Sequence, residues 1–129
     1  SPKLATQAEG RGANLPHVTA LAQPTMGAKH DVFLEIHPTA AAARGIADGD
    51  RVRIKNKIGA IEVRAKYSGT TRPDTVVLPL IHGHWAQGRW AQAPDRLPTG
   101  STNEITENLS EPLSGLACYH SGLVSVERV

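Results

Sequence analysis

Two histidines, His82 and His84, flank Gly83 directly after an apolar stretch of the sequence. Imidazole is a common metal ligand, and it also donates and accepts hydrogen bonds. A pair of histidines without a nearby carboxylate is a weak match to a metal site. The spacing therefore favours hydrogen bonding by this loop, either to a bound molecule or to the protein itself, over coordination of a metal.

The remaining reactive side chains point to structural roles. Cys118 is the only cysteine, which excludes an internal disulfide and a multi-cysteine zinc or iron–sulfur site within these residues. Asp48 and Asp50 flank Gly49, which is typical of carboxylates that hold backbone amides in a turn. The sequence has no nucleophile elbow, no phosphate-binding loop and no Gly-x-Gly-x-x-Gly motif. We therefore expect no self-sufficient enzyme in this chain.

The composition is that of one globular domain of 129 residues, with 40% hydrophobic and 20% charged residues. Fourteen Lys and Arg against twelve Asp and Glu leave a net charge of +2, which is too small to indicate a nucleic-acid or membrane surface. No apolar run approaches the roughly 20 residues that span a bilayer. The chain begins at Ser1 without an initiator Met or a signal peptide, so we expect a processed product or a piece of a larger protein, and its compartment stays unknown.

Alternating hydrophobic residues predict the scaffold that must position these groups. Strands are expected at 31–36, 51–55, 60–67, 75–80 and 123–129, with a weaker candidate at 3–7. A short helix is expected at 38–44, because Pro38 suits a first helical turn and four alanines follow shortly after it. Residues 56–59 are expected to form a tight reversal. Six short strands without helical heptads favour a closed β-barrel over a βαβ sheet.

Two irregular segments, 8–29 and 81–121, flank the predicted scaffold and are rich in Gly, Pro, Ser, Thr, Asn, His and Trp. Irregular connections of this length in a compact domain are usually functional. We therefore expect two long loops laid over the barrel. For Trp85 and Trp90 we favour packing as part of a lid in the second loop over a role as stacking platforms.

One stretch of the chain shows a definite order of elements. It reads Ala43-Arg-Gly-Ile-Ala-Asp-Gly-Asp-Arg-Val52, in which a helix ends at Gly45, Ile46 enters the core and a turn leads into a strand. Together with the Lys-Asn-Lys-Ile-Gly-Ala-Ile-Glu-Val that follows, it resembles the C-terminal dinucleotide-binding domain of the molybdopterin oxidoreductases, the dimethyl-sulfoxide-reductase superfamily.

Further segments occur in the order that this family shows. They are Pro38–Ala41, Arg72–Val76, His82–Trp85 with Gly88–Ala91, Asn103–Ile105 and Leu113–Gly115. The histidine–glycine loop is similar to that of the branch that includes polysulfide, thiosulfate, tetrathionate and arsenate reductases. The first segment departs from the pattern, because Thr6–Arg11 stands where members often carry Thr-Gly-Arg.

The resemblance implies a mainly β fold, a six-stranded double-psi β-barrel with one or two short helices and two long loops. Residues 1–129 would form a single molybdopterin dinucleotide-binding domain, a fragment or subunit of a larger enzyme. The implied cofactor is a bis-(molybdopterin guanine dinucleotide) with molybdenum or tungsten. The domain would close over the pterin dinucleotide and be catalytically silent on its own, while the parent enzyme performs two-electron oxygen- or sulfur-atom transfer.

The pyrophosphate of such a cofactor is bound by Arg side chains and backbone N–H groups. Its pterin and guanine edges require side chains that both donate and accept hydrogen bonds. The candidate cofactor-binding residues are Thr6, Gln7, Arg11, Asn14, His17, His82, Gly83, His84, Asn103 and Ser114. Packing at the barrel mouth remains open for Asn14 and His17, and a plain turn remains open for Ser114. No catalytic residue and no metal ligand is expected, Cys118 included, because the family's metal-ligating residue lies in an earlier domain.

The resemblance also implies partners: the remaining catalytic domains of the large subunit and an iron–sulfur electron-transfer subunit, which would carry any iron–sulfur cluster. They would work in a bacterial or archaeal periplasm or cytoplasm, without nucleic acid and without direct membrane insertion. The alternative is a stand-alone double-psi barrel that serves as a binding module, against which the polar segment 81–121 argues. A self-processing decarboxylase barrel would need a Gly-Ser cleavage site, and Gly100-Ser101 lacks the surrounding pattern.

Overall fold

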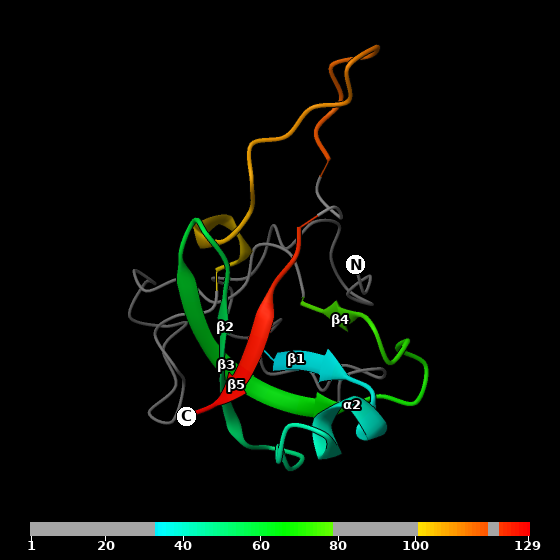
Figure 1. The fold of residues 1–129 in the computed structure, drawn as a ribbon, viewed down its shortest axis with the longest axis vertical. Coiled ribbons are helices and arrows are strands. Elements are labelled where there is room, and N and C mark those ends of the chain that lie inside the picture. The colour runs from blue at the N-terminus through cyan, green and yellow to red at the C-terminus, as the bar shows by residue number, and fades with distance from the viewer. Residues whose placement is uncertain (1–32, 79–100, 119–121) are drawn as a thin grey trace, which may run out of the picture.

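The computed structural model describes residues 33–78, 101–118 and 122–129. Five strands in these residues form one sheet in the order β4-β1-β3-β2-β5. The elements are β1 (Phe33–Ile36), α2 (Pro38–Ala42), β2 (Arg51–Lys55), β3 (Ala60–Tyr67), β4 (Val76–Val77), the 3-10 helix η2 (Thr102–Glu104) and β5 (Ser125–Arg128). Strands β1 and β3 are parallel, and the other neighbouring pairs are antiparallel. Figure 1 shows that the sheet is strongly curled.

The core lies on the inner face of this sheet. Apolar and polar residues alternate along β2 and β3, so the apolar residues of both strands share this face. Val52 and Ile54 of β2 are buried, and they pair with Val63 and Ile61 of β3. Arg51, Arg53 and Lys55 point to the opposite, solvent-facing side. The core cluster is completed by Leu34, Ile36, Ala40, Ala41, Ile46 and Ala65. The period-2 pattern of the sequence therefore predicted these two strands and their buried face.

Helix α2 ends two residues earlier than the sequence indicated. The Nδ1 atom of His37 accepts a hydrogen bond from the backbone N–H of Thr39 at 3.2 Å and caps the helix N-terminus. At the other end, the backbone N–H of Gly45 donates to the carbonyl of Ala42, a tighter spacing than in an α-helix, and Gly45 adopts a φ of 65°. This turn directs the next residue, Ile46, into the core, where it is 2% exposed.

The turn between α2 and β2 uses its two carboxylates as the sequence predicted. Asp48 Oδ1 accepts a hydrogen bond from the backbone N–H of Tyr67 at 2.6 Å, and Asp50 Oδ2 accepts one from Ala47 at 2.8 Å. Asp50 also pairs with Arg128 of β5 at 3.0 Å. Both carboxylates therefore fix the ends of strands.

The expectation of a mainly β fold with a short helix is confirmed, and five strands are present among the described residues. Strands β4 and β5 lie at the two edges of the sheet. The strand expected at 75–80 is observed only as Val76–Val77, and residues 79–80 and the weaker candidate at 3–7 lie outside the described residues. No helix among the described residues is long and apolar enough to cross a membrane.

The β2–β3 turn holds η2 against the sheet. Asn56 Oδ1 accepts hydrogen bonds from the backbone N–H groups of Ile58 at 2.8 Å and Gly59 at 3.1 Å, which closes the turn. The same side chain donates from Nδ2 to the carbonyl of Ile105 at 2.6 Å. A Cβ atom at Gly59 would lie 2.6 Å from the carbonyl oxygen of Glu104, so the close approach of η2 requires glycine here. We call these contacts the Asn56 clamp.

The clamp generates a prediction, because Asn56→Asp keeps the acceptor oxygen of the turn and removes the donor to Ile105. The new carboxylate would repel that carbonyl, and we expect η2 to lose about 1–3 kcal/mol of local stability. The backbone amides of Glu104 and Ile105, which donate within this short helix, should then exchange with solvent roughly tenfold faster or more. Hydrogen exchange measured by NMR reports both amides.

Lys57→Ala is the matched control in the same turn. It removes only the ion pair between Lys57 and Glu107, in which the lysine side chain is 73% exposed, and should change local stability by less than about 1 kcal/mol. Gly59→Ala should also lower the local stability of η2, because its Cβ atom would collide with the carbonyl oxygen of Glu104. Unchanged protection of Glu104 and Ile105 in Asn56→Asp would show that the clamp does not hold η2.

Candidate functional site

Two of the ten candidate cofactor-binding residues lie in the described part of the chain. These are Asn103 in η2 and Ser114 in the segment that follows it. The other eight, Thr6, Gln7, Arg11, Asn14, His17, His82, Gly83 and His84, lie outside the described residues, and so do Trp85 and Trp90. Their roles stay predictions.

Asn103 is the central residue of η2 and is exposed to solvent. The helix that carries it is fixed by the Asn56 clamp and by a hydrogen bond from the Thr106 hydroxyl to the carbonyl of Thr102 at 2.7 Å. Its own side-chain amide makes no hydrogen bond with the described residues. A donor and an acceptor are therefore presented to solvent from a firmly held backbone.

Ser114 is engaged within its own turn. Its hydroxyl donates to Glu111 Oε2 at 2.6 Å, and the backbone N–H groups of Leu113 and Ser114 donate to the same carboxylate at 3.0 and 2.6 Å. Gly115 follows with a φ of 71°, which closes the turn. These contacts are those of the plain turn that the sequence left open, and a cofactor contact by Ser114 stays a prediction.

The structure does not bring Asn103 and Ser114 to one place. Asn103 lies on η2 at the β2–β3 turn, whereas the segment that carries Ser114 extends away from the sheet (Figure 1). Asn103 is therefore the described candidate that lies against the sheet.

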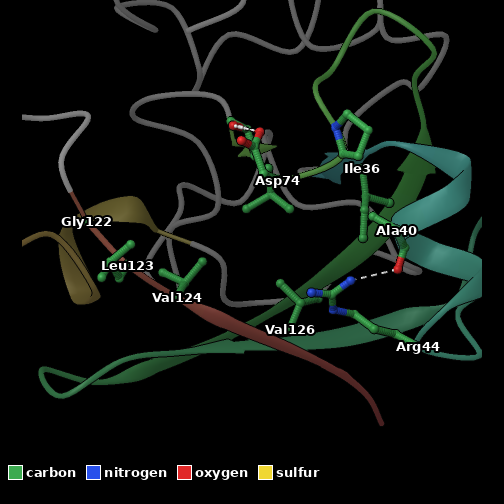
Figure 2. Close-up of a pocket in the computed structure, with 11 residues that line it drawn as sticks. Ile36, Ala40, Arg44, Asp74, Gly122, Leu123, Val124 and Val126 are labelled. Atoms are coloured by element: carbon green, nitrogen blue, oxygen red, sulfur yellow. Dashed lines mark hydrogen bonds between the residues drawn. The ribbon is translucent and has the colours of Figure 1, made fainter.

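A cavity of about 320 Å³ lies between α2, the loop before β4 and the segment that enters β5, as Figure 2 shows. Its lining includes Ile36 and Val126 together with the charged side chains of Arg44 and Asp74. Arg44 donates to the carbonyl of Ala40 at 2.8 Å. Asp74 accepts two hydrogen bonds from Arg72, which is the main reason that the pKa of Asp74 lies below its usual range. The cavity thus combines apolar side chains with the charged Arg44 and Asp74, and no motif in the sequence indicated it.

Metal binding has no support among the described residues, where no group of three or more His, Cys, Asp or Glu side chains is placed to hold an ion. Cys118 is partly buried, and its Sγ atom lies 3.9 Å from the carbonyl oxygen of Leu116. An exposed amide on a fixed helix suits the polar edge of an organic group better than a metal. A cofactor contact by Asn103 therefore stays a prediction.

The turn at Ser114 generates a pH prediction. The Ser114 hydroxyl, and then the backbone N–H groups of Leu113 and Ser114, hold the pKa of Glu111 below its ordinary value. A carboxyl with a lowered folded pKa contributes stability above its unfolded pKa and loses it as the pH falls through the folded pKa. The turn should therefore loosen only when the pH falls below the ordinary pKa of glutamate. The amide resonances of Leu113 and Ser114 should follow this transition in an NMR titration.

Glu111→Gln is the control for this titration, because it keeps the shape of the side chain and removes its charge. In this variant the two amide resonances should not change over the same pH range. A wild-type transition at the ordinary pKa of glutamate would show that the carboxylate does not hold the turn in solution.

Comparison with known proteins identifies the family of this chain. The molybdopterin dinucleotide binding domain family matches residues 10–123. The molybdopterin-containing subunit of the arsenate respiratory reductase of Shewanella sp. strain ANA-3 is 33% identical over 126 residues, which cover 94% of this chain and 15% of that protein. Dimethyl sulfoxide reductase DmsA of Escherichia coli K12 is 34% identical over 97 residues, covering 73% of this chain and 11% of that protein.

A solved structure agrees with these relatives at the level of the fold. Acetylene hydratase from Pelobacter acetylenicus matches all of this chain and 21% of its own chain, with a TM-score of 0.63 and 14% sequence identity. The relatives include both arsenate and dimethyl sulfoxide reductases, so the branch suggested by the histidine–glycine loop stays a prediction. The family itself is shown: the chain belongs to the molybdopterin dinucleotide-binding domains of the molybdopterin oxidoreductases.

Proposed function

We propose that this chain closes over the pterin dinucleotide of a bis-(molybdopterin guanine dinucleotide) cofactor within a larger catalytic subunit. The cofactor, when bound, supplies the molybdenum or tungsten and with it the two-electron redox chemistry. The part of this chain is to bind and orient the organic portion. The family match over residues 10–123 supports this function over that of a stand-alone interaction module.

The activity of the whole enzyme is a proposal of the same kind, because the chain spans only 15% and 11% of the two curated relatives described above. Their names give arsenate and dimethyl sulfoxide as substrates. We infer transfer of an oxygen or sulfur atom to or from a small substrate, in the branch that includes the polysulfide, thiosulfate and arsenate reductases. The proposed partners are the remaining catalytic domains and an iron–sulfur electron-transfer subunit.

The single observation that carries the binding role is the presentation of Asn103. Its carboxamide donates and accepts within one planar group, and the edges of guanine and pterin offer adjacent donors and acceptors. The Asn56 clamp fixes the backbone of η2 before any ligand arrives. Little ordering of η2 is then required on binding, which favours affinity.

A closed six-stranded double-psi barrel is our proposal for the complete fold. It is supported by the cavity, whose lining includes Val76 of edge strand β4 and Val126 of edge strand β5. Another strand between these edges would pair their backbone groups and cover the apolar lining. The candidate from the sequence is 3–7.

The binding role predicts that Asn103→Ala weakens the hold on the cofactor in the enzyme that contains this chain. Losing one or two hydrogen bonds should accelerate cofactor release about tenfold, since each contributes roughly 1 kcal/mol. Release is followed by the fluorescence of oxidised molybdopterin and by the guanine nucleotide freed on hydrolysis, after the purified enzyme is incubated in mild urea.

Asn108→Ala is the matched control, because Asn108 is an exposed asparagine outside η2. It should release the cofactor at the wild-type rate. Equal release from wild type and Asn103→Ala would remove Asn103 from the binding surface. A wild-type enzyme purified without any molybdopterin would contradict the proposed function as a whole.

A further inference from the structure

The segment 106–118, which we call the leucine arm, projects from η2 well beyond the sheet (Figure 1). Its leucines face solvent: Leu109 is 43%, Leu113 96% and Leu116 71% exposed. The sheet, in contrast, buries Leu34 and the isoleucines that line its inner face. Large apolar side chains exposed along a projection are typical of a surface that another protein segment covers.

The arm has a defined conformation. The backbone N–H of Glu111 donates to the carbonyl of Leu116 at 2.8 Å, and that of Cys118 donates to Leu109 at 2.9 Å. Ser110 and Ala117 form a β-bridge between these two contacts. The described backbone hydrogen bonds thus join the two limbs of the arm to each other. A two-stranded hairpin of this kind is marginally stable in water by itself, so covering its apolar tip would stabilise it.

The base of the arm is fixed, so its direction is set by the domain. Lys57 pairs with Glu107 at 2.8 Å, and the Asn56 clamp holds Ile105 just before the arm begins. A fixed base and a structured tip together present the leucines at one place relative to η2.

The chemistry of the tip indicates what covers it. The Glu111 carboxylate accepts hydrogen bonds from the Ser114 hydroxyl and from backbone amides within the turn, while Leu113 and Leu116 stay exposed on the arm. An apolar recess suits these two leucine side chains. A narrow arm offers little of the roughly 1,200–2,000 Å² that a stable dimer buries, which argues against a second copy. The relatives carry several times more chain than this domain, 85% or more of their length.

We propose that the leucine arm docks into an apolar recess on the remainder of the catalytic polypeptide and thereby fixes this domain over the cofactor. The inference rests on the proposed function, because it needs a larger molybdopterin enzyme. Leu113 and Leu116 are the anchors, and the turn at Glu111 positions them.

The test uses the purified enzyme that contains this chain, with a photo-crosslinking amino acid at position 113. Mass spectrometry should find crosslinks to peptides of the catalytic polypeptide outside this domain. In a second measurement, the double variant Leu113→Ser/Leu116→Ser should be cleaved within 106–118 by a protease about tenfold faster than wild type, because the covered leucines no longer contribute to docking. Leu113→Ile is the matched control and should be cleaved at close to the wild-type rate.

Crosslinks to a second copy of this domain, no crosslink at all, or equal cleavage of the double variant and wild type would each overturn the docking proposal. Molybdopterin content is measured in the same samples. Wild type that holds the cofactor while the arm behaves as free would reject the docking and leave the proposed function standing. Wild type without the cofactor would reject the proposed function itself.

Discussion

The side chain of Asn56 joins two parts of the chain that lie 49 residues apart in sequence. Its oxygen closes the β2–β3 turn and its nitrogen holds η2, while Gly59 allows the backbone of Glu104 to approach. Both halves of one amide group are thus used. Everything proposed for the segment 101–118 depends on this clamp, because among the described residues it is the principal hydrogen-bonded link between that segment and the sheet.

The strands themselves could be predicted from the sequence because their cause is local. In β2 and β3, alternate residues are apolar, and one face of a curled sheet buries them, so the pattern indicates both the strands and their buried face. The order of the strands in the sheet depends on long-range pairing and could not be predicted in this way. The outer face adds ion pairs such as Arg53 with Glu62, which holds the pKa of Glu62 below its usual range. These pairs are exposed and contribute little to stability compared with the buried face.

The clamp could not be predicted in the same way. Asn56 to Gly59 reads as a tight turn, and a turn is what it forms, but no local pattern shows which distant carbonyl the asparagine amide will contact. The two described site candidates differ in the range of the contacts that place them. Ser114 is engaged by Glu111 three residues away, a local contact that agrees with the plain turn left open by the sequence, whereas Asn103 is exposed on a helix that a contact across 49 residues holds. Only the second kind of contact lies beyond a local sequence pattern.

The clamp also links the two roles proposed for 101–118. Asn103 would contact the cofactor, and Leu113 would contact the rest of the catalytic polypeptide, and both follow from a backbone held at Ile105. A hairpin with an exposed apolar tip gains stability only when docked, while η2 is already fixed by the sheet. Docking would therefore restrict the motion of the leucine arm, whereas η2 is already held by the sheet. On this argument the domain is aligned over the cofactor by contacts at both ends of one short segment.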